Sequence, residues 1–433
     1  MSESANNSPT ATLSGSTEPT DVVPELIRER RGSIIQNFQN LRDKSQQYVP
    51  GNPIYPIVPV DTDREKWNEA LSRLRLQFLP PLRHQIDTLI RLLHPSELQD
   101  DVDGSRLALI IDIQAELDQS LHEILTIATG IKDKPVSSPT RADDQDLQEF
   151  KEFTRQGLSS ALKFLIHQVN SIFEQSSHVI KELTKPSTST IESHQHLQSS
   201  LRFAILRRAS VAATSIDRVI QWITADEFAL IQVHWGSGSC DPYNEFLTDL
   251  PKLIYRAIHH LEPNYFNDGY TKYLKNEHAL PLAHALTPLM KLSRLFFKKL
   301  VKDGLNQTPS KPYTDMNSYQ LQTIGDSVGF IMLYLFHIMK SIAEYGTEYR
   351  HDEENLNPEL IEGVIKKIIR RFDSNILLII TYIIPLISDS PSEPNQFQTY
   401  LVEWNSLFLI ASQRCIFATQ YYNAASQAAG PHE

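Results

Sequence analysis

Glycine and cysteine are both scarce in this sequence. Glycine accounts for only 15 of 433 residues, about half of the ~7% that is average for proteins. This scarcity disfavours turn-rich β-sandwiches, glycine-rich nucleotide loops and collagen-like repeats. The two cysteines, Cys240 and Cys415, are too few for a disulfide framework, so we expect a reducing compartment, the cytoplasm or the nucleus.

The sequence also lacks an apolar run long enough to cross a membrane. The two most apolar stretches, 328–339 and 376–387, each have about 12 residues, whereas a membrane-spanning helix needs about 20. We therefore expect buried core helices in both places and no transmembrane segment. Residues 1–20 are rich in Ser, Thr, Pro, Asn and Glu and have no apolar signal-peptide core, which predicts a disordered tail.

Positive charge is in deficit. The chain has 41 Lys plus Arg against 52 Asp plus Glu, for a net charge of −11, and neither half of the sequence is basic. Domains that bind nucleic acids neutralise phosphates with clustered Lys and Arg. We therefore expect no nucleic-acid partner.

Apolar residues recur at intervals of three and four, as in Ile110, Ile113, Leu117 and Leu121, which is typical of amphipathic helices. No segment is a convincing strand. The pattern predicts an all-α fold of about ten long helices, arranged as two antiparallel helical bundles or as one elongated helical body. The main helices are expected at about 106–129, 146–183, 191–222, 226–234, 243–260, 280–303, 316–345, 358–389 and 396–426.

The densest cluster of helix breakers, in residues 235–242, contains two glycines and a proline and is a candidate domain boundary. The division expected from it is a disordered tail at 1–20, an N-terminal helical bundle at 21–235 and a C-terminal helical bundle at 241–426. Earlier in the chain, Pro80 and Pro81 are expected to kink or interrupt a helix.

The motifs of common metal and cofactor sites are incomplete. A di-iron bundle needs two Glu-x-x-His pairs, and the sequence has one, Glu348 and His351. The acidic run 99–104 lacks the first Asp and the twelfth-position Glu of a calcium loop, and 236–240 lacks the lysine of a phosphate-binding loop. We therefore predict no catalytic, cofactor-binding or metal-binding residue, and a protein that is not an enzyme.

A cluster of basic residues is the best-formed surface feature. Four cations share one side of the helix expected at 358–389, opposite an isoleucine-rich side. They are Lys366, Lys367, Arg370 and Arg371. A solvated outer face is the plain interpretation of such a pattern. The functional one is a docking face for an acidic protein partner or for an anionic membrane.

Two segments match the Arg-Arg-x-Ser pattern that basophilic kinases favour, and they make Ser33 and Ser210 candidate phosphosites. A phosphate would add about −2 charge beside two arginines. Ser33 lies close to the expected tail and is predicted to be accessible, whereas Ser210 lies in a long expected helix and is predicted to be shielded.

Several short motifs resemble a known group of proteins. Leu79-Pro80-Pro81-Leu82, Ile113–Asp118, Lys291–Phe297 and Trp404-Asn405 resemble an uncharacterised all-helical family that is expanded in rust fungi, over most of the chain after about residue 60. The layout of the helices alone is similar to the cyclin-D-interacting protein family, whose members have two helical bundles and bind other proteins. Neither resemblance supplies catalytic residues, and likeness of fold does not establish function.

Three functions stay open at this point. The leading hypothesis is a non-enzymatic interaction or scaffold protein with an unknown protein partner, because long helices offer docking surface. The second is an all-α enzyme or small-ligand-binding protein with its site in a bundle core, built on histidines such as His167 and His337. The third is a peripheral membrane or lipid-binding protein.

Overall fold

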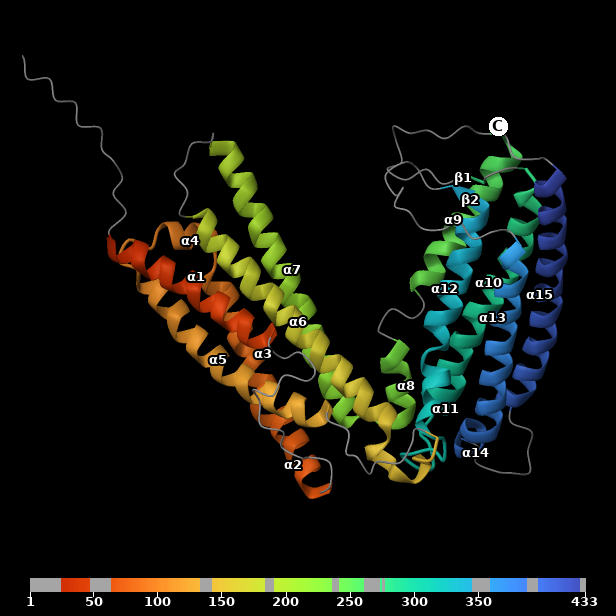
Figure 1. Cartoon of the computed structure of the whole chain (residues 1–433), viewed down its shortest axis with the longest axis horizontal. Coiled ribbons are helices and arrows are strands. Elements are labelled where there is room, and N and C mark those ends of the chain that lie inside the picture. The colour runs from red at the N-terminus through yellow and green to blue at the C-terminus, as the bar shows by residue number, and fades with distance from the viewer. Residues whose placement is uncertain are drawn as a thin grey trace, which may run out of the picture. The chain divides into compact units, whose positions relative to one another are not determined.

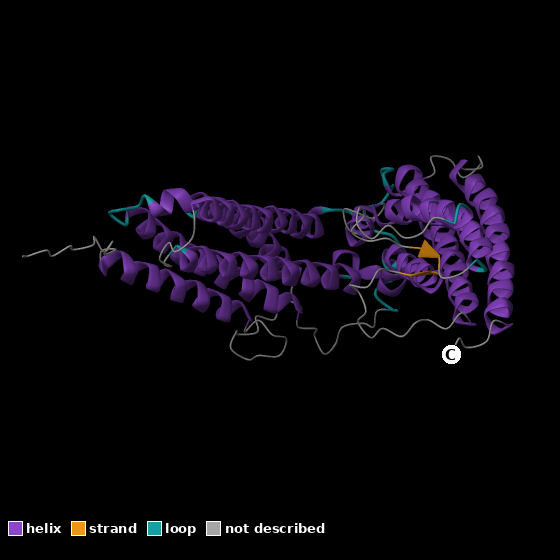
Figure 2. Cartoon of the chain, turned by 90° about the horizontal axis from the view of Figure 1, so that it is seen from above, coloured by secondary structure: helices purple, strands orange, loops and turns teal. Residues whose placement is uncertain are grey.

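The structure is a computed structural model, and nearly every residue that it describes is helical (Figure 2). The prediction of an all-α fold is therefore confirmed. The predicted disordered tail, 1–20, lies outside the described residues. The structure describes residues 25–46, 64–132, 142–183, 191–235, 241–260, 273–274, 277–344, 359–387 and 396–428.

Up to Thr224, the described part of the chain is built from helical elements alone (Figure 1). The elements are α1 (Glu25–Gln46), α2 (Arg64–Arg73), the π-helical η2 (Leu74–Phe78), α3 (Leu79–Leu92), α4 (Pro95–Gln99), α5 (Ser105–Lys132), the 3₁₀ segment η3 (Gln145–Phe150), α6 (Glu152–Glu182) and α7 (Ile191–Thr224).

The second half continues in the same way and adds one short pairing of strands. Its elements are α8 (Glu227–Trp235), α9 (Asp241–Ile258), β1 (Tyr273–Leu274), α10 (Ala279–Leu300), the π-helical η4 (Val301–Leu305), α11 (Ser318–Gly325), α12 (Ser327–Ile342), β2 (Ala343–Glu344), α13 (Glu359–Leu378), the π-helical η6 (Ile379–Ile383), α14 (Ile384–Ile387) and α15 (Gln396–Ala428). The strands are antiparallel, with Tyr273 opposite Glu344 and Leu274 opposite Ala343.

The helix expected around Pro80 and Pro81 is interrupted just before them, because the π-helical η2 separates α2 from α3. The two prolines lie in the first turn of α3, where a missing N–H costs nothing. The helix expected at 316–345 is broken at Asp326 into α11 and α12, whose axes differ by 42°. The two apolar runs are helical as expected, in α12 and in the stretch from α13 to α14.

No single helix among the described residues has both the length and the apolarity to cross a membrane. One bent pair, α11 with α12, meets those criteria only when its two helices are counted together.

The chain forms two compact units that are not contiguous in sequence. Unit 1 comprises 1–52, 78–125 and 167–212, and unit 2 comprises 53–77, 126–166 and 213–433. The limits of these units fall inside α5, α6 and α7. Each of these long helices therefore contributes residues to both units. The division predicted from the sequence, at 235–241, stays a prediction.

Unit 1 has an apolar core with a few buried polar bonds. The rings of Phe38 in α1 and Phe173 in α6 stack with centroids 5.9 Å apart. The buried Gln114 of α5 donates to the backbone carbonyl of Ile34 at 2.9 Å and accepts from Asn37 Nδ2 at 3.2 Å. Because a buried amide without partners is costly, these bonds specify how α1 and α5 pack.

Unit 2 has an aromatic core where α10, α13 and α15 pack side by side (Figure 1). Phe372 lies at its centre, with ring centroids 5.0 Å from Phe296, 5.0 Å from Trp404 and 4.6 Å from Phe408. The indole N–H of Trp404 donates to the carbonyl of Leu292 at 2.9 Å. Large rings that also satisfy their polar atoms make this contact specific as well as apolar.

Gly157 of α6 is required by close packing. A Cβ atom at this position would lie 2.0 Å from the ring of Trp222 in α7. We predict that Gly157→Ala lowers the free energy of unfolding of unit 2 by about 1–3 kcal/mol, because the indole must move. Gly363→Ala in α13, where no atom lies within 4 Å of the added Cβ, should instead be neutral or stabilising by up to about 1 kcal/mol.

Urea unfolding followed by tryptophan fluorescence measures this effect. All four tryptophans, Trp67, Trp222, Trp235 and Trp404, belong to unit 2, so the signal reports that unit. Equal stability of the two alanine variants would contradict the close-packing interpretation.

Candidate functional site

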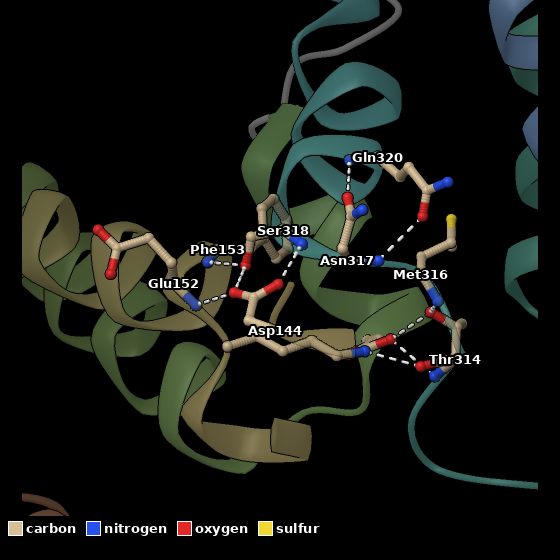
Figure 3. Close-up of polar contacts among 10 residues, drawn as sticks. Asp144, Glu152, Phe153, Thr314, Met316, Asn317, Ser318 and Gln320 are labelled. Carbon is tan, nitrogen blue, oxygen red and sulfur yellow. Dashed lines mark hydrogen bonds and ion pairs between the residues drawn. The ribbon is translucent and has the colours of Figure 1, made fainter. Parts of the chain in front are cut away.

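The densest group of buried charges in the described residues surrounds segment 312–318, which leads into α11 and includes its first residue (Figure 3). Within unit 2, this segment lies against the start of α6 and the start of α8. The side chains that meet here come from positions as far as 174 residues apart in the sequence. These side chains belong to Asp144, Lys151, Glu227, Thr314 and Ser318. Each of these residues is at most 3% exposed.

Lys151 and Glu227 form a fully buried ion pair. Lys151 Nζ lies 2.7 Å from Glu227 Oε1 and also donates to the backbone carbonyl of Thr314 at 2.7 Å. The other carboxylate oxygen, Oε2, accepts from both the backbone N–H and the hydroxyl of Thr314, each at 2.7 Å. Burial raises the pKa of Glu227, although the Lys151 charge and the Thr314 bonds act in the opposite direction.

Asp144 serves the N-termini of two helices at once. Its Oδ2 accepts from the backbone N–H of Glu152, the first residue of α6, at 2.9 Å. Its Oδ1 accepts from the backbone N–H of Ser318, the first residue of α11, at 2.7 Å. The hydroxyl of Ser318 donates to Asp144 at 2.5 Å and accepts from the N–H of Phe153 at 2.7 Å. A carboxylate is favoured here because the N–H groups of a helix start have no partners within the helix.

α11 begins with a complete capping box. Asn317 accepts from the backbone N–H of Gln320 at 2.9 Å, and the Gln320 side chain accepts from the backbone N–H of Asn317 at 2.9 Å. Asn317 also donates to the carbonyl of Ala142 at 3.0 Å. The start of α11 is therefore bonded within its own helix and to the segment that precedes α6.

The chemistry of this network is structural. Both oxygens of Asp144 and both of Glu227 accept hydrogen bonds from the protein, and the side chains of Lys151 and Glu227 have no exposed surface. A catalytic acid or base must reach a substrate, and these groups face one another instead. Among the described residues, no group of three or more His, Cys, Asp or Glu has the arrangement of a metal site.

A second polar pair lies at the bend between α11 and α12. His234 Nε2 of α8 lies 2.8 Å from Oδ1 of Asp326, and the ring of His234 lies against Gly325, where an added Cβ would be 2.9 Å from Cδ2. Burial raises the pKa of Asp326, but hydrogen bonds from His234 and Gln322 and the charges of His234 and Arg371 outweigh it and hold the pKa below its usual value.

The predicted cations of α13 lie as the sequence pattern requires. Lys366, Lys367 and Arg370 are exposed and Arg371 is half-buried, while Ile365 and Ile368 are buried on the other side. The positions of these side chains therefore agree with the sequence pattern. Their role as a docking face stays a prediction.

Aromatic side chains of α12 flank these cations. The Arg371 guanidinium lies over the ring of Phe330, with its carbon 4.6 Å from the centroid, and Lys367 Nζ is 6.0 Å from the centroid of Tyr334. Such cation–π contacts fix the position of otherwise mobile side chains. We define the α12–α13 face by Phe330, Leu333, Tyr334, Lys366, Lys367, Arg370 and Arg371.

The two candidate phosphosites occupy helices. Ser33 is exposed in α1, but its neighbours are engaged, because Arg30 donates to the carbonyl of Gly104 at 2.7 Å and Arg31 is buried and donates to the carbonyl of Leu183 at 3.2 Å. Ser210 is exposed in α7 together with both preceding arginines, so the expectation that it is shielded is wrong. A helix position does not by itself predict burial, because only one face of a helix is covered.

The histidines proposed for a bundle-core site do not form one. His167 is exposed on α6 and His337 is half-buried on α12.

Cys415 is buried, and its thiol donates to the carbonyl of Ala285 at 3.0 Å. Burial raises the pKa of this thiol to about 12, which makes it unreactive. Glu348, His351 and Cys240 lie outside the described residues.

Sequence reasoning missed Asp144, Lys151 and Glu227. The distances along the chain between bonded partners, 76 residues for Lys151 and Glu227 and 174 for Asp144 and Ser318, explain this omission. Asp144 precedes η3 but makes no side-chain cap bond to it, and it lies eight residues before Glu152, the α6 residue that it accepts from, so a local capping pattern does not signal its role. No local pattern distinguishes Lys151 or Glu227 from solvated charges.

Comparisons with known families divide the chain into two parts. Residues 67–224 match the family described as Domain of unknown function (DUF8723), and residues 226–416 match Domain of unknown function (DUF8721). The matches adjoin between α7 and α8, upstream of the predicted boundary at 235–241. No curated protein and no solved structure matches the chain. An uncharacterised family is thus supported, and the resemblances to rust-fungal and cyclin-D-interacting proteins stay predictions.

Removal of one member of the buried ion pair should be costly. We predict that Lys151→Met lowers the free energy of unfolding of unit 2 by about 3–5 kcal/mol, because Glu227 is then buried without its cation. The double variant Lys151→Met with Glu227→Gln should lose less than the single variant, since no unpaired carboxylate remains. Lys163→Met, at an exposed position of α6, the helix that follows Lys151, is the matched control and should change stability little. Tryptophan-monitored urea unfolding gives all three values, and a Lys151→Met variant as stable as the control would refute the assignment.

The free energy of unfolding of unit 2 should depend on pH through Asp326. Its ionised form is favoured in the folded state, so its contribution is present above the unfolded-state pKa, near 3.8, and is lost as the pH falls through the lower folded-state pKa. We predict that Asp326→Asn destabilises unit 2 at pH 6 and that the difference from the natural chain shrinks toward pH 3. Asp373→Asn, at an exposed position of α13, serves as control. A difference that stays constant across this range would contradict the assignment.

Proposed function

We propose that this chain is a non-enzymatic protein-binding protein whose α12–α13 face docks an acidic, partly apolar segment of another protein. One observation carries the proposal: three exposed cations, Lys366, Lys367 and Arg370, adjoin exposed apolar side chains of the neighbouring helix. Those apolar side chains include Phe330, 38% exposed, and Leu333, 45% exposed.

The composition of this face supports a protein partner. Aromatic residues and Arg are enriched in protein interfaces, and a rigid apolar centre with a charged rim is their usual anatomy. The stacking of Arg371 on Phe330 reduces the side-chain freedom that binding would otherwise remove. Lys366 is paired with Glu362 at 2.6 Å, so Lys367 and Arg370 are the cations most available to a partner's carboxylates.

The charge of the whole chain makes the cluster distinctive. The chain carries a net charge of −11, so the chain as a whole repels an acidic partner at long range. A local cationic face then selects orientation, because complementary potentials act mainly on specificity and association rate. The proposal includes a cytoplasmic or nuclear location, for which the scarcity of cysteine is the support.

The test reverses the charges of the face. We predict that Lys366→Glu, Lys367→Glu and Arg370→Glu together remove at least one stoichiometric partner from affinity purifications of the tagged full chain, as quantified by mass spectrometry. The matched control, Lys252→Glu, Lys291→Glu and Lys298→Glu, changes three exposed lysines of α9 and α10 by the same total charge and should retain that partner.

Direct binding completes the experiment. The recovered partner, purified, should bind the natural chain about tenfold or more tightly than the charge-reversed variant, and higher salt should narrow the gap. An identical set of partners for both triple variants would overturn the proposal. So would salt-sensitive binding of the natural chain to anionic vesicles without any protein partner, because that result identifies a membrane as the ligand.

A further inference from the structure

α15 carries an unusual outer face. On its inner side, this 33-residue helix packs against α10 and α13 through buried residues such as Trp404 and Phe408. On its outer side, large apolar residues are exposed, and α15 lies at the edge of the group of unit 2 helices (Figure 1). An exposed apolar helix face of this kind marks an interaction site more often than a solvated surface.

The exposed residues follow the repeat of a coiled coil. Six positions along the outer side are separated by four, three, four, three and four residues, which is the alternation of the a and d positions of heptads. We call them the α15 seam: Glu403, Leu407, Ile410, Arg414, Phe417 and Tyr421. The apolar members are 56%, 54%, 62% and 56% exposed in that order. The seam runs for about 27 Å along the helix, at about 1.5 Å per residue.

The charges on α15 are arranged symmetrically about the centre of this seam. Glu403 and Arg414 are the only charged residues of the helix, and both belong to the seam. Each lies four residues outside the central pair, Leu407 and Ile410. Neither has a hydrogen bond or an ion pair within the described part of the chain.

This symmetry selects one partner and one orientation. In an antiparallel pair of α15 helices related by a two-fold axis between positions 407 and 410, Glu403 of each copy faces Arg414 of the other. Leu407 of each copy then faces Ile410 of the other, as an isologous interface requires. A parallel pair would place Glu403 against Glu403 and Arg414 against Arg414, which like-charge repulsion disfavours.

We infer that two copies of this chain associate through the α15 seam as an antiparallel, two-fold symmetric homodimer. The apolar positions provide the attraction, and the two reciprocal ion pairs set register and direction. The inference goes beyond the proposed function and does not depend on it, because the α12–α13 face is made of other residues.

The experiment exchanges the two charges. The full chain is examined by sedimentation equilibrium and light scattering, where a dimer has twice the 49.4 kDa mass of the chain. We predict that Glu403→Arg alone and Arg414→Glu alone each raise the dissociation constant by about tenfold or more. The double variant with both exchanges should return to near the natural value.

Mixing the two single variants tests the antiparallel orientation. One variant then has only arginine at positions 403 and 414 and the other only glutamate, so in an equimolar mixture the heterodimer should form more tightly than either variant associates with itself. A parallel arrangement predicts the same heterodimer, but it also predicts that neither the natural chain nor the double exchange dimerises, since each would oppose like charges. The full set of four measurements therefore identifies the orientation.

A second pair of variants separates association from folding. Leu407→Lys with Ile410→Lys should abolish dimerisation and leave the helical circular dichroism unchanged. Leu295→Lys with Leu377→Lys, at exposed apolar positions of α10 and α13, is the matched control and should stay dimeric. A natural chain that is monomeric at about 50 μM overturns the inference. This holds even if another part of the chain or a lipid is then found to cover the seam. A dimer insensitive to both single exchanges also overturns it.

Discussion

The carboxylate of Asp144 accepts hydrogen bonds from the first N–H groups of two helices, α6 and α11, and the arrangement of unit 2 around segment 312–318 depends on this sharing. Helix starts that are buried need acceptors for N–H groups that the helix itself does not satisfy. Here the two helices supply one another, since the Ser318 hydroxyl of α11 accepts from the Phe153 N–H of α6. The Lys151–Glu227 pair continues the same network to α8.

A buried network of this kind contributes to specificity more than to net stability. The desolvation of two charges offsets much of their attraction, so an apolar substitute of the same shape could be as stable. What the network adds is a single position for the start of α11. The capping box at Asn317 and the contact between His234 and Asp326 then fix both ends of this short helix.

The surfaces follow from that placement. α12 begins after the bend at Asp326 and lies against α13, so the stacking of Arg371 on Phe330 depends on where α11 ends. The outer face of α15 differs from the α12–α13 face because it carries almost no charge. Its two charged residues, Glu403 and Arg414, specify the antiparallel orientation of the inferred helix pair. One face is thus defined by clustered charge and the other by the placement of isolated charges within an apolar stripe.

Local periodicity determined the helices, and it did so because the 3.6-residue repeat of apolar positions is a property of neighbouring residues. It also determined that Lys366, Lys367 and Arg370 share the side of α13 opposite the buried isoleucines. Periodicity shows that one face of a helix is apolar and says nothing of which neighbour covers it. The exposure of His167 and Ser210 was therefore decided only by tertiary packing.

The bend at Asp326 and the buried pair of Lys151 and Glu227 were likewise decided by tertiary packing. Their causes are contacts between residues 76 to 92 positions apart, which no local pattern encodes. The sequence by itself determined an all-α chain without a recognisable catalytic motif, because those properties rest on composition and spacing. The tertiary structure decided which charges are buried as structural partners and which remain on the surface to meet another molecule, because that distinction depends on which helices pack together.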